Sequence, residues 1–289
     1  MYWVWFSTIK GLGPIKKRAL LEIYKSPKVI WGLQKNDLLK IEGIGDKLAN
    51  EILDKQNKKN IDNYMKILER EKIELITFEN KYYPKILKHI YDYPISLYVK
   101  GNKAILNDFC LAIIGSRFNT QYGKVVTEAI SGELAKRNVN IVSGMASGID
   151  SIAHRSCIEN KGKTIAVLGS GLMEIYPPEN KDLFYDIIEK GGAVISEYPV
   201  TERPLKNNFP ARNRIISGIS HGVIVSEARE KSGTIITIDC GLEQGKNIFA
   251  VPGNINLETS RGTNNLIKQG AKMVTNIQDI LEEYKILNL

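Results

Sequence analysis

The sequence contains little of what a metal site or a disulfide framework needs. It has 3 cysteines and 3 histidines among 289 residues. Cys110, Cys157 and Cys240 are far apart, and none has a second cysteine or a histidine at metal-ligand spacing. The cysteines are therefore predicted to be small buried hydrophobic residues. No zinc site and no cofactor are expected.

Long apolar runs are missing as well. No stretch approaches the roughly 18 apolar residues that cross a membrane. Residues 1–10 are apolar, but they have neither a basic region nor a small-residue cleavage site, so they are not interpreted as a signal peptide. We expect a cytoplasmic protein with no membrane partner. Hydrophobic residues make up 43% of the chain and charged residues 25%, which is ordinary for a globular protein that buries a core.

Acidic residues are scarce in one part of the chain only. Residues 1–66 hold 13 Lys and Arg against 7 Asp and Glu, and the rest holds 27 against 25. The formal net charge of +8 is therefore concentrated near the N-terminus. An excess of positive charge favours an anionic partner. A nucleic-acid site in the larger part must be a local cluster of cations.

The N-terminal region predicts a small helical domain over residues 1–65. Two segments, Gly11-Leu12-Gly13 and Gly43-Ile44-Gly45, each place an apolar residue between two glycines ahead of an amphipathic helix. This pattern resembles the helix-hairpin-helix motif, and Ala49 falls where that motif packs a small residue. Such turns can hold a backbone phosphate, or they can serve helix packing alone. The polar stretch 55–66 predicts a helix end that runs into a linker.

Residues 66–289 predict a second domain with a doubly wound, mostly parallel α/β sheet of the extended Rossmann type. Short apolar β-rich runs, bounded by glycine, alternate with helical stretches. They lie at 96–99, 111–115, 140–144, 164–169, 193–197, 222–227 and 247–253. Ligands of such sheets bind in the loops that follow the carboxyl ends of the strands.

Those loops are rich in glycine and hydroxyl residues, which predicts phosphate-binding turns. Glycine lets the backbone approach an anion, and Ser and Thr hydroxyls can hydrogen-bond to it. The strand end at 196–199 (SEYP) is a further polar turn. The predicted phosphate-binding residues are Gly115, Ser116, Ser143, Gly144, Gly148, Gly169, Gly171, Ser232, Gly233 and Thr234. Glu174 occupies the third glycine of a dinucleotide fingerprint, and no P-loop is present, so neither NAD binding nor ATPase activity is expected.

The densest basic segment is 203–214, RPLKNNFPARNR. It has four cations, no acidic residue and one aromatic ring. Arginine grips phosphate oxygens, and an aromatic ring can stack on a base, so this composition is typical of single-strand binding. An exposed segment whose charges are merely solvated is the alternative.

Taken in order, these motifs resemble the DprA/Smf family of DNA-processing proteins. The segments are GSRxxxxYG (115–123), SGMASGIDSIAH (143–154), AVLGSGLMEIYPPENK (166–181), SEYP (196–199), FPARNRIISG (209–218), SEARxxSGT (226–234) and FAVPGN…SRGTNNLIKQGA (249–271). The resemblance implies single-stranded DNA binding, protection of incoming DNA during natural transformation, loading of RecA recombinase, and a homodimer. It assigns DNA binding to Arg117, Lys181, Lys206, Phe209, Arg212, Asn213 and Arg214, and the dimer interface to Ile267 and Met273. Because the sequence stops at Leu289, we expect no C-terminal winged helix of the kind found in many members.

Two other functions remain open. Nucleoside-monophosphate phosphoribohydrolases use a similar set of loops, and Glu197 or Glu227 could act as a general base. However, the PGGxGT loop of those enzymes is replaced by residues 231–237, KSGTIIT. The remaining alternative is an interaction module that does not bind DNA. A non-enzymatic DNA-binding protein is the prediction.

Overall fold

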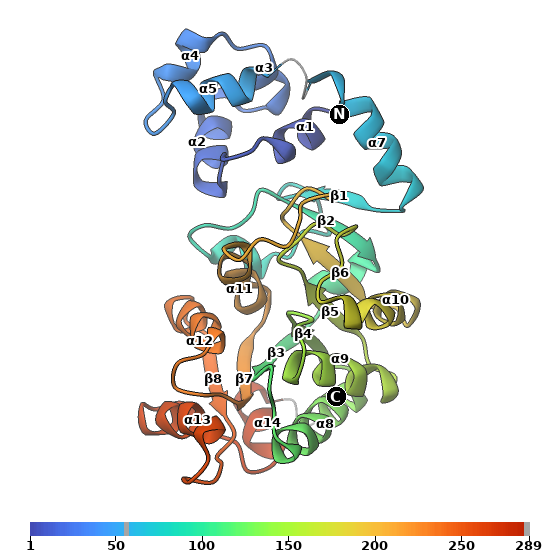
Figure 1. Cartoon of the computed structure of the whole chain (residues 1–289), viewed down its shortest axis with the longest axis vertical. Coiled ribbons are helices and arrows are strands. Elements are labelled where there is room, and N and C mark those ends of the chain that lie inside the picture. The colour runs from blue at the N-terminus through green and yellow to red at the C-terminus, as the bar shows by residue number, and fades with distance from the viewer. Residues whose placement is uncertain (55–57, 286–289) are drawn as a thin grey trace.

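The computed structural model describes residues 1–54 and 58–285, in which a helical N-terminal part stands at one end of an α/β part (Figure 1). The N-terminal helices are α1 (Tyr2–Thr8), α2 (Pro14–Tyr24), α3 (Pro27–Trp31), α4 (Lys35–Leu39), α5 (Asp46–Leu53) and α7 (Ile61–Arg70). Gly11 and Gly43 both have positive φ, 71° and 78°, which a side chain would disfavour. Ala49 is fully buried. The prediction that an all-helical part precedes the sheet is confirmed.

The linker predicted over 55–66 is wrong for most of its length. Residues 55–57 lie outside the described residues, but α7 begins at Ile61. Ile61 and Leu68 are buried, and the backbone N–H of Val200 donates to Tyr64 Oη at 2.7 Å. The three inward residues are spaced by three and four positions, which is the helical period. The polar residues between them hid that period.

The α/β part contains a nine-stranded sheet in the order β1-β2-β6-β5-β4-β3-β7-β8-β9. All seven predicted strands form. The strands are β1 (Glu74–Thr77), β2 (Ser96–Gly101), β3 (Cys110–Gly115), β4 (Asn140–Ser143), β5 (Thr164–Val167), β6 (Ala193–Ser196), β7 (Gly222–Glu227), β8 (Asn247–Ala250) and β9 (Lys272–Met273). Strands β3 to β9 run parallel, whereas β2 pairs antiparallel with both β1 and β6. The edge strands β1 and β9 were not predicted.

Helices cover both faces of the sheet, as the fold class requires (Figure 1). Leu111 and Ile113 of β3 point into one cluster, and Ala112 and Ile114 point into the other, because side chains alternate along a strand. One layer contains α8 (Gln121–Lys136), α9 (Ile149–Glu159), α10 (Lys181–Glu189) and α14 (Gln278–Tyr284). The other contains α11 (Asn208–Ile219), α12 (Gly233–Glu243) and α13 (Glu258–Lys268).

The helical part shares a hydrophobic cluster with the sheet. Trp5 and Phe6 belong to the same cluster as Tyr98 of β2 and Phe184 of α10. Ser7 Oγ and Tyr98 Oη also lie 2.6 Å apart and share a hydrogen bond. The helical part is therefore packed against the sheet through a continuous core. A domain division after residue 65 stays a prediction.

The chain order of the sheet reverses beside β3, which lies between β4 and β7. Loops at such a switch point diverge toward opposite faces of the sheet and leave a crevice at the carboxyl ends of the strands.

Among residues 1–54 and 58–285, no helix has the length and apolarity to cross a membrane, and no three His, Cys, Asp or Glu residues gather as metal ligands would. Cys110 and Cys157 are buried as predicted, whereas Cys240 is only partly buried.

Candidate functional site

A cleft of about 620 Å³ opens at the switch point between β3 and β7. Its walls come from the turn after β3, the first half of α11 with the segment before it, and the loop from β7 into α12. The charged residues that line it are Arg117, Lys206, Arg212, Arg229 and Asp150. Four cations and one carboxylate give the cleft a strongly positive character, although the whole α/β part is nearly neutral.

The turn Gly115-Ser116-Arg117 is held from three sides. The Ser116 N–H donates to the carbonyl oxygen of Glu227 at 2.8 Å, and the Ile149 N–H donates to the carbonyl oxygen of Ser116 at 3.1 Å. Thr234 Oγ1 donates to the carbonyl oxygen of Gly115 at 3.1 Å. The backbone under Arg117 is therefore fixed, while the Arg117 side chain is exposed in the cleft.

Arg212 forms the floor of the cleft and is only 5% exposed. Its Nη1 donates to the carbonyl oxygens of Gly144, at 2.8 Å, and of Val167. A methyl group at Gly144 would lie 2.8 Å from Arg212 Nη2, so glycine is needed there to admit the guanidinium. Burial lowers the pKa of Arg212 to about 10, against the opposing effect of Asp150, and the side chain stays charged at neutral pH.

Asp150 orders the loop that follows β4. Its Oδ2 accepts hydrogen bonds from the N–H groups of Gly144, at 3.1 Å, and Ala146, at 3.4 Å. Burial raises the pKa of this carboxyl, and the Arg212 charge opposes that rise. Asp150 thus stabilises both the loop and the cation beside it.

Aromatic rings line the cleft beside the cations. Phe209 packs against Tyr176 with ring centroids 5.5 Å apart, and Phe118 is 80% exposed. A methyl group at Gly169 would lie 2.8 Å from the Phe209 ring, so this glycine makes room for the ring. A smaller cavity of about 130 Å³ adjoins the cleft and shares Arg117, Tyr176, Phe209 and Arg212 with it.

The N-terminus of α12 also faces the cleft. Ser232 is its N-cap residue, but its side chain makes no capping hydrogen bond, and its buried Oγ has no partner among the described residues. Gly233 has no atom within 4 Å of the place where a side chain would begin. Unpaired amide groups and a free hydroxyl at a helix N-terminus are suited to an anion.

The structure brings together most, but not all, of the predicted DNA-binding residues. Arg117, Lys206, Phe209, Arg212 and Asn213 line the cleft. Lys181 is exposed at the start of α10, outside the lining of both cavities. Arg214 is 8% exposed on the other face of α11, where it pairs with Glu197 and Asp92 at 2.8 Å each. Burial alone would lower the pKa of Arg214, but the two carboxylates hold it above its usual range.

Some of the predicted phosphate-binding residues line the cavities, and the others do not. Gly115, Ser116, Ser232, Gly233 and Thr234 line the large cleft, and Gly144 lines the smaller cavity. The others serve packing. Ser143 Oγ donates to the carbonyl oxygen of Ile113, Gly148 lies against the backbone of Ser116 and Arg117, and Gly171 lies against Pro199 and Val200.

Sequence reasoning missed the cleft residues Phe118, Asp150, Tyr176 and Arg229. Each lies inside or beside a segment that predicted the site, but none stands out by composition.

The two predicted dimer residues differ in exposure. Met273 is 48% exposed on the edge strand β9, whereas Ile267 is partly buried against the core.

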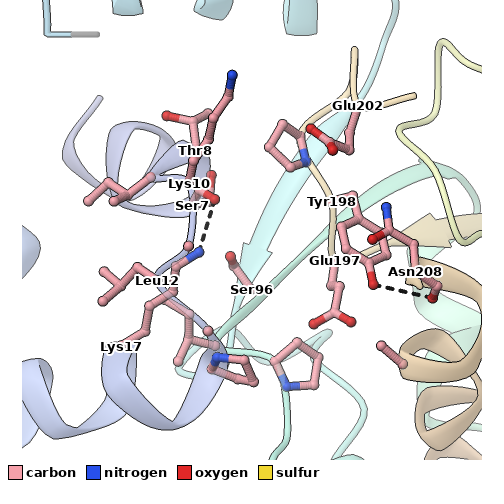
Figure 2. Close-up of a pocket in the computed structure, with 18 of the residues that line it drawn as sticks. Ser7, Thr8, Lys10, Leu12, Lys17, Ser96, Glu197, Tyr198, Glu202 and Asn208 are labelled. Atoms are coloured by element: carbon pink, nitrogen blue, oxygen red, sulfur yellow. Dashed lines mark hydrogen bonds between the residues drawn. The ribbon is translucent and has the colours of Figure 1, made fainter. Parts of the chain in front are cut away.

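A second cavity of about 620 Å³ lies between the helical part and the sheet, behind α11 (Figure 2). Lys17 Nζ donates to the carbonyl oxygen of Ser7 at 2.9 Å on its wall. Burial lowers the pKa of Lys17 to about 8, and Glu197 opposes this. The charged residues that line this second cavity are Lys10, Lys17, Arg214, Asp92, Glu197 and Glu202. This balance of charges makes it a poor site for a polyanion, and the cleft remains the candidate.

The model of the DNA recombination-mediator protein A family matches residues 74–285. Protein Smf of Escherichia coli (strain K12) is 44% identical to the chain over 225 residues, which are 78% of this chain and 60% of that protein. The chain thus spans less than two thirds of that relative. DNA processing protein DprA of Streptococcus pneumoniae is 40% identical over 280 residues, which are 91% of this chain and 98% of that protein.

Two solved structures are similar over long segments. The X-ray structure of DNA processing protein A from Streptococcus pneumoniae matches with a TM-score of 0.83 at 38% identity, and the match covers 98% of this chain and 97% of that one. DNA processing protein A from Helicobacter pylori, described for its single-stranded DNA binding mode, matches with a TM-score of 0.66 at 34% identity. That match covers 73% of this chain and 96% of that one.

Proposed function

The chain belongs to the DNA recombination-mediator protein A family, whose relatives include proteins named Smf and DprA, and on this premise we propose that it binds single-stranded DNA in the cleft at the β3–β7 switch point. One observation carries the proposal. Four cations, three aromatic rings and a helix N-terminus with an unpaired hydroxyl all line one cleft. A single strand offers phosphates to the cations and unpaired bases to the rings.

The arrangement favours a single strand over a duplex. In a duplex the bases are stacked on one another, so their faces cannot reach Phe118 or the Phe209–Tyr176 pair. Arg212 lies on the floor of the cleft, where a backbone that bends inward can reach it, and Arg117 and Lys206 are exposed in the walls. We infer that phosphates follow Arg117, Lys206 and the start of α12, with one or two bases against the rings.

The test is a titration of labelled oligo-dT, and of the matching duplex, over a salt series. One phosphate contact for each of the four cleft cations predicts a slope of about −2.8 in a plot of log affinity against log salt concentration for a single strand. This slope is a loss of affinity of about 50-fold between 50 and 200 mM salt. Arg117→Ala and Lys206→Ala should each flatten the slope by about 0.7. Lys190→Ala, an exposed lysine outside the cleft, is the matched control. Absence of binding, or cleft variants that behave like the control, would refute the proposal.

We further propose that the protein processes incoming DNA in the cytoplasm during natural transformation, protects it, and loads RecA recombinase onto it. The family description, a recombination mediator, and the relatives named as DNA-processing proteins support this role. RecA hydrolyses ATP when it assembles on single-stranded DNA, so the test is RecA ATPase activity on DNA already coated with single-strand binding protein. The protein should shorten the lag, and Arg117→Ala should not.

A homodimer would place two clefts along one strand and increase avidity. Met273 is the better placed of the two predicted dimer residues, because it is exposed on an edge strand. Met273→Glu should then lower the sedimentation coefficient to that of a monomer and should weaken binding of long oligonucleotides more than that of short ones. Equal sedimentation of the variant and the wild type would refute this interface.

The carboxylates considered as general bases are both engaged in structural contacts. Glu197 accepts two hydrogen bonds from Arg214, each of 2.8 Å, and Glu227, which is 2% exposed, accepts the N–H of Thr120 at 2.9 Å. These contacts favour a binding role over phosphoribohydrolase activity. Release of free base from nucleoside monophosphates would contradict a binding-only function.

A further inference from the structure

Arg229 is an exposed cleft cation that lies close to an acidic side chain. It follows β7 in the loop that leads to α12, and it lines the cleft. Its Nη1 lies 3.9 Å from Glu258 Oε2, and the two side chains are 46% and 67% exposed. That separation is beyond hydrogen-bond range, and an ion pair this exposed contributes little. A better anionic partner can therefore displace Glu258.

The backbone keeps the two residues within reach of each other. The Gly262 N–H of α13 donates to the carbonyl oxygen of Ala228 at 2.9 Å, and Asn265 Nδ2 donates to Glu230 Oε1 at 2.7 Å. Helix α13 is thus fastened to the loop that carries Arg229. Glu258 is the first residue of that helix, where the helix dipole stabilises its charge. The backbone that carries the carboxylate is therefore held close to Arg229.

We propose that Arg229 is a further DNA-binding residue that exchanges partners: it pairs with Glu258 in the free protein and with a DNA phosphate when a strand enters the cleft. This inference rests on the proposed function of the cleft. A phosphate at the α12 N-terminus would lie beside Arg229, because Ser232 and Gly233 follow it within four residues and line the same cleft. A guanidinium binds a phosphate through two parallel hydrogen bonds, which the 3.9 Å contact with Glu258 does not supply.

The exchange gives Glu258 a definite effect on binding. Before Arg229 can bind a phosphate, it must leave the carboxylate. Glu258→Gln removes that competition, so the affinity for oligo-dT should rise, by up to about fivefold for a surface pair of this kind. Arg229→Ala should lower the affinity and flatten the salt slope by about 0.7. In the double variant the glutamine should have no effect, since there is no arginine left to release.

The experiment is this set of variants, titrated with oligo-dT over a salt series, with Lys231→Ala as the matched control. Lys231 is an exposed cation in the same loop that does not line the cleft. The expected result is that Lys231→Ala keeps the wild-type slope and Arg229→Ala does not. Equal thermal midpoints for all variants would show that the differences arise in binding.

Other outcomes separate the two levels of the inference. If the wild type binds no single-stranded DNA, the proposed function fails and the exchange fails with it. If Arg117→Ala flattens the slope but Arg229→Ala matches Lys231→Ala, the cleft binds DNA and the role of Arg229 is refuted. If Glu258→Gln raises the affinity equally in the Arg229→Ala background, Glu258 acts by general repulsion and the exchange is overturned.

Discussion

Arg212 and Arg214 are two residues apart on α11, but Arg212 lines the cleft whereas Arg214 forms a buried ion pair on the other face of the helix. Substituting Arg214 should therefore lower the stability of the protein and leave DNA binding unchanged. Arg214 donates three hydrogen bonds of 2.8 Å to the carboxylates of Glu197 and Asp92, and a fourth of 3.0 Å to the carbonyl oxygen of Ala211. Arg214→Met would leave Glu197, whose side chain is 13% exposed, without its counter-ion. Removing one partner of a buried ion pair costs about 3–5 kcal/mol. Asp92, at 37% exposure, adds little because water can solvate it.

The assay is urea unfolding together with the oligo-dT salt titration. Arg214→Met should move the unfolding midpoint to markedly lower urea while the salt slope of the folded protein stays as in the wild type. Arg214→Met combined with Glu197→Gln should recover a large part of the loss, because no charge is then left buried and unpaired. The reasoning is refuted if Arg214→Met unfolds at the wild-type midpoint and its salt slope is flatter by about 0.7, since Arg214 would then contact DNA.

Two other predictions concern stability. His154 is fully buried, and burial lowers its pKa to about 3, so between pH 6.5 and about 3 the unfolded chain binds a proton that the folded protein excludes. The wild type should therefore lose stability as pH falls through this window, by up to about 1.4 kcal/mol per pH unit relative to His154→Gln; parallel pH profiles in urea unfolding would contradict this. Gly148 has a φ of 79°, and a methyl group there would overlap the carbonyl oxygens of Ser116 and Arg117. Gly148→Ala should cost more than about 1 kcal/mol and should displace the Arg117 turn, whereas Gly233→Ala, with open space around it, should unfold like the wild type. Equal midpoints for the two glycine variants would show that Gly148 does not support the turn.

The sequence predicted those parts of the fold that have a regular apolar pattern. The seven predicted strands are continuous apolar runs bounded by glycine, and such runs are visible in the sequence without any tertiary information. Ile76 is the one buried residue of β1, and neither residue of β9 is buried, so neither strand forms a buried apolar run. Helix α7 was taken for a linker because its inward face has few apolar residues. The antiparallel pairing of β2 could not be read from its sequence, since a buried strand has the same composition in either direction.

For the site, the sequence located the loops but not the faces of the elements that carry them. Residues 203–214 looked like a single basic patch because their helical part was not assigned. In a helix, two residues two positions apart point about 200° apart, so Arg212 and Arg214 cannot both face the cleft. The glycines posed a similar problem. Gly144 and Gly169 read as phosphate-binding turns, but each makes room for a side chain of α11, Arg212 or Phe209, that lies far away in the sequence.

Helix α11 lies between the cleft and the cavity that the helical N-terminal part lines. Asn208, Ala211 and Arg214 line the cavity behind the helix, while Phe209, Arg212 and Asn213 line the cleft in front of it. The rear cavity is lined by residues Ser7–Pro14, and Lys17 and Glu197 lie on its walls (Figure 2). Because a helix moves as a unit, whatever fixes its rear face also fixes the positions of Phe209 and Arg212. The helical part thus faces α11 across the rear cavity, where Lys17 interacts electrostatically with Glu197, the ion-pair partner of Arg214.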